Sequence, residues 1–277
     1  MTAILVIKHG ALGDLVQAFG PFAAIRAHHA GAHIDLLTTP PFAALMGRAP
    51  WFDRVLTDHR PPWWHLPAQL ALAGRLAAAG YARVYDLQTS ARSSRLLGWM
   101  RLSGARPEWS GIARGASHPH ANPDRDAMHT QDRQREQLAM AGVTAFPVPD
   151  LAWLDGDAAR FSVGGRLALL IPGAAPHRPA KRWPAEHFAK VAELKIREGW
   201  QVWLFGSKND HPVGEEILAR LIPGLREEAV NLAGETSLAE AIDLLSCADA
   251  VVSNDSGLMH VSAALGRPLA AVYGSTS

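Results

Sequence analysis

Short apolar runs alternate with longer segments of helical period along the whole chain, and this alternation constrains the fold more than any other feature. Strands buried on both faces read as continuous Val, Ile and Leu runs, and helices that cover a sheet repeat their apolar residues at helical spacing. The pattern therefore predicts an α/β fold with parallel sheets. The expected strands are Ile4–Ile7, Ile34–Thr38, Arg54–Leu56, Arg83–Leu87, Leu167–Ile171, Gln201–Phe205, Ala229–Leu232, Ala250–Ser253 and Leu269–Tyr273. The expected helices are Leu15–His28, Trp64–Ala79, Arg92–Arg101, Gln131–Ala141, Ala185–Glu198, Glu215–Leu221, Ser237–Cys247 and Leu258–Leu265.

Length and charge limit the class of protein. A chain of 277 residues corresponds to about two domains. It carries 27 Lys and Arg against 26 Asp and Glu, and a net charge of +1 gives no footprint for nucleic acid. Pro and Gly accumulate in Phe146–Gly165, which predicts the boundary there. We expect an N-terminal domain over residues 1–155 and a C-terminal domain over residues 166–277.

The ends of the chain and its single cysteine bear on the cellular setting. The apolar run in Met1–Lys8 stops at Lys8, too short for a signal peptide, and no run approaches the length of a membrane span. We therefore expect a cytoplasmic protein. Cys247 alone excludes a disulfide scaffold, and we expect it to be a small buried side chain in a helix. The segment Arg114–His129 lacks an apolar period and is expected to be a mobile loop.

The loop after the first strand reads Lys-His-Gly-Ala-Leu-Gly-Asp and ends at Asp14. Ligands of open parallel sheets bind outside the carboxyl ends of the strands, so this loop faces a ligand site. Gly10 and Gly13 let the backbone approach a ligand, which makes Gly13 a candidate contact. Asp14 fits either of two roles, a helix N-cap or a functional carboxylate. The spacing lacks the third glycine of a dinucleotide-binding loop.

A second loop, residues 172–184, is rich in cations. Arg178, Lys181 and Arg182 lie near the start of the following helix, where Pro184 suits the first position. Cations at a helix N-terminus are unfavourable unless an anion binds there, which favours a phosphate site over a solvated basic loop.

A third strand-end segment reads Ser-Asn-Asp-Ser-Gly-Leu-Met-His over residues 253–260. Asp255 or Ser256 can cap the next helix, and Gly257 leaves backbone amides open to a phosphate. His260 follows about one turn later and is either a ligand contact or a core histidine. His28, His29, His118 and His120 stand in polar contexts without a third ligand, so no metal site is expected.

Together these segments resemble glycosyltransferase family 9, the bacterial ADP-heptose:lipopolysaccharide heptosyltransferases and their relatives. The resemblance runs in order over nearly the whole chain. It rests on the segments Ile4–Asp14, Tyr85–Gln88 with Arg92–Arg95, His129, Lys181–Pro184, Asn231–Gly234 with Ser237–Leu238, and Asn254–His260 through Leu265–Pro268 to Val272–Gly274. The first and last of these blocks are specific as a pair.

The resemblance implies a GT-B architecture, two Rossmann-like domains that face each other across a cleft, with the acceptor on the first and the nucleotide-sugar on the second. It implies inverting transfer of heptose or a related sugar from an ADP-activated donor to a lipopolysaccharide-core or other surface-glycan acceptor, without a cofactor or metal. Asp14 matches the family's general base, and Lys181 matches a lysine beside the donor phosphates. Asp255, Ser256, Gly257 and His260 match the segment that contacts the nucleotide.

One departure concerns Pro176-His177, which replaces a small hydroxylated pair in the phosphate loop; His177 could donate a hydrogen bond there instead. The resemblance also implies helices beyond residue 274, so we expect this chain to be a shortened version, and its activity stays open.

The implied acceptor is an anionic glycolipid held in a membrane. Arg92, Arg95 and the loop at Arg114 are candidate acceptor contacts, and peripheral contact with the inner membrane is an expectation. For Trp63-Trp64 a packed helix start is favoured over contact with the membrane surface. Two alternatives remain: a nucleotide-sugar epimerase of the same architecture and a non-catalytic nucleotide-sugar-binding protein.

Overall fold

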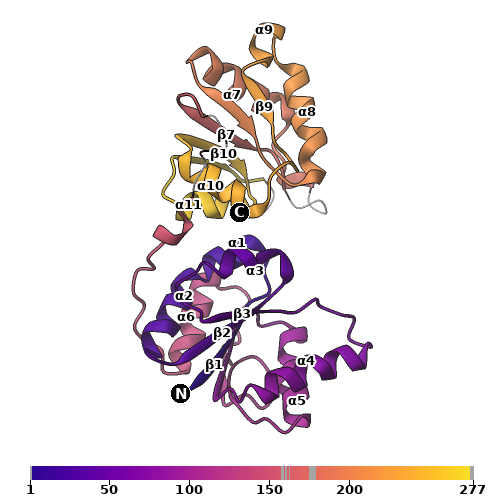
Figure 1. Cartoon of the computed structure of the whole chain (residues 1–277), viewed down its shortest axis with the longest axis vertical. Helices are drawn as coiled ribbons and strands as arrows, with labels where there is room; N and C mark the ends of the chain where they lie inside the picture. The colour runs from indigo at the N-terminus through magenta and orange to yellow at the C-terminus, as the bar shows by residue number, and fades with distance from the viewer. Residues whose placement is uncertain (1, 157–158, 160, 162, 175–178, 275–277) are drawn as a thin grey trace. The chain divides into compact units, whose positions relative to one another are not determined.

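The computed structural model describes residues 2–156, 159, 161, 163–174 and 179–274. The chain divides into two compact units, residues 1–150 and 151–277 (Figure 1). The division falls inside the Pro- and Gly-rich stretch in which the sequence places the boundary. Each unit holds one parallel sheet with its own hydrophobic core.

The first unit is built on a six-stranded parallel sheet of order β3-β2-β1-β4-β5-β6. Helices α4 and α5 cover one face of this sheet, and α1, α2 and α6 lie toward the other (Figure 1). The strands are β1 Ala3–Ile7, β2 His33–Thr38, β3 Arg54–Thr57, β4 Arg83–Asp86, β5 Glu108–Gly111 and β6 His118–Pro119. The helices are α1 Leu12–Gln17, α2 Phe19–His28, α3 Pro40–Met46, α4 Leu66–Ala78, α5 Ala91–Leu102 and α6 Thr130–Met140.

The apolar residues of α4 and α5, whose helical spacing predicted these helices, form the core beneath them. Leu72 and Leu76 of α4, and Leu97 of α5, pack on Leu5 and Ile7 of β1, and all five are buried. The first strand is central, the second and third strands lie on one side of it, and the fourth lies on the other. This strand order is that of a Rossmann-like sheet. Its switch point lies between β1 and β4, which pair in register from Ile4↔Arg83 to Ile7↔Asp86.

The second unit repeats this plan with a five-stranded parallel sheet of order β11-β10-β7-β8-β9. The strands are β7 Leu167–Ile171, β8 Gln201–Leu204, β9 Ala229–Asn231, β10 Ala250–Asn254 and β11 Leu269–Val272. The helices are α7 Ala185–Arg197, α8 His211–Arg220, α9 Pro223–Arg226, α10 Leu238–Cys247 and α11 Gly257–Ala264, with 3-10 turns η1 Ala152–Leu154, η2 Pro179–Lys181 and η3 Lys208–Asp210. Phe188 of α7 and Ile217 of α8 pack on Leu170 and Val202 in its core. The predicted α/β class with parallel sheets is confirmed.

Several elements differ from the prediction. The first predicted helix begins earlier, at Leu12, and is divided at Ala18 into α1 and α2. Helix α3 and strands β5 and β6 are additional, and β6 lies within the segment expected to be a loop. Strand β5 has no apolar run, because it reads Glu-Trp-Ser-Gly, although Trp109 is fully buried.

The expectation for Cys247 is wrong, since its side chain is exposed. Helix α10 buries the face formed by Ala241, Ile242, Leu244 and Leu245, and Cys247 is the last residue of the helix, outside that face. In the described part of the chain, no helix is both long and apolar enough to cross a bilayer.

Candidate active site

The switch point of the first sheet places a charged loop at the carboxyl end of β1. Lys8 follows β1 and is 4% exposed, and its Nζ donates a hydrogen bond to the carbonyl oxygen of Leu87, just after β4, at 3.2 Å. Burial lowers the pKa of Lys8, while the negative charges of Asp14 and Asp86 act to raise it. The ammonium group is therefore tied to both strands at the point where a ligand of such a sheet binds.

Asp14 lies in the first turn of α1, half-buried, and Ala11 rather than Asp14 occupies the N-cap position. Its Oδ2 accepts a hydrogen bond from the Ala11 backbone N–H at 3.0 Å. The simple N-cap interpretation of Asp14 is therefore wrong, although the carboxylate still satisfies one of the open amides of the helix start. Gly13 beside it is buried within α1.

Neighbouring side chains fix the loop between β1 and α1. The backbone N–H of His9 donates to Oε1 of Gln88 at 2.8 Å, and Thr39 Oγ1 donates to the carbonyl oxygen of His9 at 2.8 Å. The buried His9 ring lies 3.3 Å from Oδ2 of Asp58. Burial lowers the pKa of His9 to about 4, despite the opposing charge of Asp58, so this histidine is neutral near pH 7. His9, Thr39 and Asp58 were not among the predicted site residues.

Asp86 ends β4 directly beside this loop and is fully buried. Burial raises its pKa to about 7, and hydrogen bonds from Ser93 and from backbone amides only partly oppose the shift. Its Oδ1 accepts the backbone N–H of Thr89 at 3.0 Å. The sequence signal for Asp86 was its position at a strand end inside Tyr85–Gln88.

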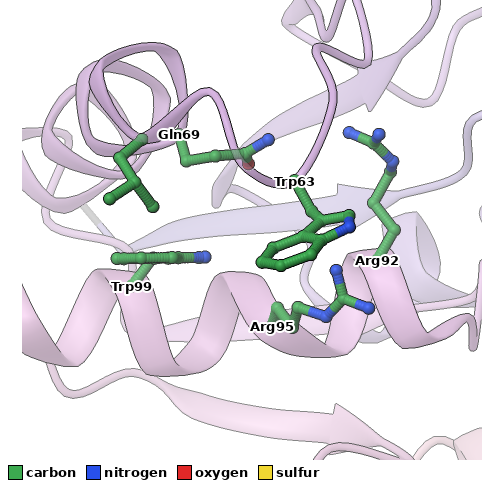
Figure 2. A pocket seen from close by; sticks show the side chains of 6 residues that line it. Trp63, Gln69, Arg92, Arg95 and Trp99 are labelled. Carbon is green, nitrogen blue, oxygen red and sulfur yellow. The ribbon is translucent and has the colours of Figure 1, made fainter.

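Arg92 and Arg95, the predicted acceptor contacts, lie on α5 and line one pocket of about 420 Å³ (Figure 2). Trp63 and Trp99 border the same pocket, together with Leu66 and Gln69. Arg92 Nη2 also donates to the carbonyl oxygen of Pro61 at 2.8 Å, which fixes the chain ahead of α4.

The packed helix start expected at Trp63-Trp64 is wrong. Trp63 is 63% exposed and Trp64 is 67% exposed. Helix α4 begins only at Leu66, and it buries Leu72, Ala73 and Leu76 against the sheet, so the two indoles precede it on the solvent side.

In the second unit the buried side chain of Asn254 joins three segments. Its Nδ2 donates to the carbonyl oxygen of Pro172 after β7 at 2.7 Å, and its Oδ1 accepts the backbone N–H of Trp183 at 3.1 Å. Asn254 itself ends β10, so the two strands at the switch point of this sheet and the loop before α7 are held together.

That frame brings together three predicted donor-site residues. Lys181 Nζ forms an ion pair with Oδ2 of Asp255, and the Nε2 atom of His260 lies 4.0 Å from Oδ1 of the same carboxylate. Ser256 is the N-cap of α11, and its Oγ accepts the backbone N–H of Met259 at 3.3 Å. Gly257 is the first residue of the helix. His177 and Arg178 lie outside the described residues.

Arg182 takes part in the same loop structure. Its Nη2 donates to the carbonyl oxygen of Ala174 at 3.1 Å and lies 3.7 Å from Oδ1 of Asp210. Asp210 also accepts hydrogen bonds from the backbone and the hydroxyl of Ser207. A Cβ atom at Gly173 would lie 2.5 Å from Cγ of Asp210, so only glycine allows this close approach. Asp210 was not among the predicted site residues.

Comparisons with known proteins identify the family of this chain. A family model described as glycosyltransferase family 9 (heptosyltransferase) matches residues 69–277. Lipopolysaccharide heptosyltransferase 2 of Salmonella typhimurium is 34% identical over 295 residues, which cover 99% of this chain and 83% of that protein. Lipooligosaccharide heptosyltransferase 2 of Haemophilus influenzae is 61% identical over 99 residues, which cover 36% of this chain and 29% of that protein.

The solved structure of the Escherichia coli ADP-heptose LPS heptosyltransferase II superposes with a TM-score of 0.81 at 30% identity, over 100% of this chain and 86% of that one. The predicted GT-B class is thereby confirmed, as is the expectation that the protein is a glycosyltransferase. The chain belongs to glycosyltransferase family 9, the heptosyltransferase family.

Proposed function

We propose that this chain moves heptose from ADP-heptose to a growing lipopolysaccharide core, with inversion at the anomeric carbon and with Asp14 as the general base. The relatives that are 34% identical over 99% of this chain are lipopolysaccharide heptosyltransferases. A related solved structure holds ADP-2-deoxy-2-fluoro heptose. The observation that carries the proposal is a half-buried carboxylate at the switch point of the first sheet, together with a lysine and a capped helix start at the switch point of the second.

The Asp14 carboxylate suits proton removal from an acceptor hydroxyl. Inverting transfer requires one base that takes this proton as the oxygen attacks the anomeric carbon. The Ala11 N–H holds Oδ2 of Asp14 and so fixes the direction of the carboxylate. A glycosidase would instead need two carboxyl groups flanking the bond.

Lys181 and the start of α11 suit the leaving diphosphate. Negative charge grows on the ADP as the glycosidic bond breaks, and fixed cations and helix-start amides stabilise such charge. Asp255 holds the Lys181 ammonium group next to the N-terminus of α11. Ser256, Gly257 and His260 then contribute a hydroxyl, backbone amides and a ring nitrogen around the donor, with Gly13 and His177 as further donor contacts.

These charges support a reaction that needs neither cofactor nor metal. Among the residues that the structure describes, no group of three or more His, Cys, Asp or Glu side chains is arranged to hold a metal ion. We expect the rate of transfer to be the same before and after dialysis against excess EDTA. Loss of activity that Mg²⁺ or Mn²⁺ restores would contradict this.

The acceptor is an anionic glycolipid, and Arg92 and Arg95 are its contacts. Their guanidinium groups pair with carboxylates or phosphates in bidentate geometry, and the indoles of Trp63 and Trp99 offer flat apolar faces beside them. Since such an acceptor is held in a bilayer, the enzyme works in peripheral contact with the inner membrane, at its cytoplasmic face.

Incubation with ADP-heptose, with and without acceptor, tests the function. We expect ADP release only when the acceptor is present, in step with a product one heptose heavier. Isomerised nucleotide-sugar without ADP release would indicate an epimerase instead. Binding without turnover would indicate a non-catalytic binding protein.

A further inference from the structure

Exposed apolar side chains gather on one side of the first unit. Eleven large hydrophobic residues of the described chain are exposed, and five of them fall between residues 63 and 102. These five are Trp63, Trp64, Leu66, Leu70 and Leu102. Leu66 and Leu70 share one side of α4 because they are four residues apart. A surface of this kind marks an interaction site when it is contiguous.

Two adjoining pockets show that this surface is continuous. Trp63 and Leu66 line the pocket of Figure 2 with Arg95 and Trp99, and the next pocket shares Arg95 and Trp99 and reaches Leu102. The rings of Trp63 and Trp64 lie 5.9 Å apart, so Trp64 extends the same area. We call these residues, with the arginines between them, the α4–α5 surface.

The charge of this region is positive. Residues 59–107 contain seven arginines, no lysine and a single acidic residue, the fully buried Asp86; of the seven, Arg83 on β4 is paired with Glu108 and does not count toward this surface. Neither α4 nor α5 contains an acidic residue. Arg95 on α5 is exposed, and the exposed Arg114 borders the end of the surface beside Leu102. The partner of this surface is therefore anionic as well as apolar.

We propose that the α4–α5 surface docks the protein on an anionic phospholipid bilayer. Indole rings favour the boundary between headgroups and acyl chains, leucines insert just below it, and guanidinium groups pair with phosphodiesters. The proposal rests on the proposed function, because docking here brings the Arg92–Arg95 pocket to the level at which a membrane-held acceptor presents its sugars. Phosphatidylglycerol supplies the required chemistry, a negative phosphodiester on a glycerolipid.

Vesicle co-sedimentation of the full chain tests this surface. We expect the wild type to bind phosphatidylethanolamine vesicles that contain about one third phosphatidylglycerol, to bind phosphatidylcholine vesicles weakly, and to dissociate as salt is raised. The double variant Trp64→Ser/Leu102→Ser should lose roughly tenfold or more in partitioning, because two large apolar side chains no longer insert. The matched control Val148→Ser/Leu194→Ser, two exposed apolar residues elsewhere, should bind as the wild type does.

Transfer to a soluble acceptor without acyl chains separates docking from catalysis. We expect Trp64→Ser/Leu102→Ser to keep its kcat/KM on this acceptor and its thermal unfolding midpoint. The proposal is overturned if the wild type does not prefer anionic vesicles or if the double variant binds them normally. If the double variant loses activity on the soluble acceptor, the surface serves sugar binding instead. If the double variant loses only self-association, the surface binds a second copy of the chain. A wild type without transfer on the soluble acceptor contradicts the proposed function, whatever its vesicle binding.

Discussion

At the scale of single residues, the ion pair between Lys181 and Asp255 joins segments 74 positions apart in the sequence. A free lysine has many rotamers, and holding one of them in place costs entropy that binding must otherwise supply. The ion pair with Asp255 already restricts the Lys181 side chain in the folded protein, before any ligand binds. The ammonium group therefore stays next to the start of α11, where the proposed diphosphate would lie.

Lys181→Met should raise the Kd for ADP roughly ten- to hundredfold, since a hydrogen bond to a charged group contributes about 1.5–3 kcal/mol. The loss includes repulsion between Asp255 and the phosphates, so Lys181→Met/Asp255→Asn should recover part of it. Calorimetric titration with ADP measures both. The control is Lys190→Met, an exposed lysine on α7. Equal affinities for Lys181→Met and wild type would show that Lys181 has no role in ADP binding.

His29 makes stability depend on pH. Burial lowers its pKa to about 4, and its Nε2 atom lies 2.7 Å from the Tyr85 hydroxyl. The unfolded chain, with an ordinary histidine pKa near 6.5, therefore binds more protons between about pH 6.5 and pH 4. The stability that neutral His29 contributes is thus present above about pH 6.5 and is lost as the pH falls toward 4.

Urea unfolding at several pH values between about 7.5 and 4 measures this loss. The free energy of unfolding of His29→Gln should fall less steeply with acidification than that of the wild type. The control variant is His59→Gln, which replaces a histidine at an exposed position. Parallel curves for His29→Gln and wild type would show that His29 titrates alike in both states.

At the scale of elements, the candidate residues of each unit lie on a strand end, a loop and the first turn of a helix. Asp14 lies in the first turn of α1, and Ser256 caps α11. Side chains from other segments fix these loops through hydrogen bonds to the loop backbone. Gln88 and Thr39 hold the loop after β1, and Asn254 holds the loop after β7.

Two serine caps of the second unit separate stability from ligand binding. Ser256 caps α11 and Ser237 caps α10, each with its Oγ accepting an amide of the first turn at 3.3 Å. Replacing either serine by alanine should lower the free energy of unfolding by about 0.5–2 kcal/mol. Only Ser256→Ala should also weaken ADP binding, which chemical unfolding and calorimetry together would show. Equal ADP affinity in the two variants would remove Ser256 from the donor site.

The elements that the sequence predicted share a strong apolar period. Strands β1 and β7 consist of Ile, Leu and Val with one Ala each, half of β2 is Ile or Leu, and α7 shows a clear apolar face. Elements without that signal were missed: β5 has one large apolar residue, and α3 begins with two prolines. Cys247 and Trp63 show a further limit, because composition gives the residue type but helix phase and helix start decide exposure.

At the scale of the whole molecule, each sheet has its first strand in an inner position. The next two strands lie on one side of it and the fourth lies on the other side, so the strand order reverses at the first strand. This order brings the ends of β1 and β4 together, and those of β7 and β10. The sequence could therefore indicate which loops lie together in each unit and carry the candidate residues. It could not predict the contact of His9 with Asp58 or of Arg182 with Asp210, because these pairs form only after distant loops have packed.

The proposed transfer chemistry depends most directly on Asp14 as the general base. Asp14→Asn keeps an oxygen that can accept the Ala11 N–H, so the start of α1 should be preserved. Single-turnover transfer from ADP-heptose, measured beside calorimetric titration with ADP, separates chemistry from binding. We predict an ADP affinity near that of the wild type and a transfer rate lower by roughly 10²–10⁴-fold, the usual contribution of a general base. A transfer rate within about threefold of the wild type would contradict the role of Asp14 as general base, since no such contribution would remain.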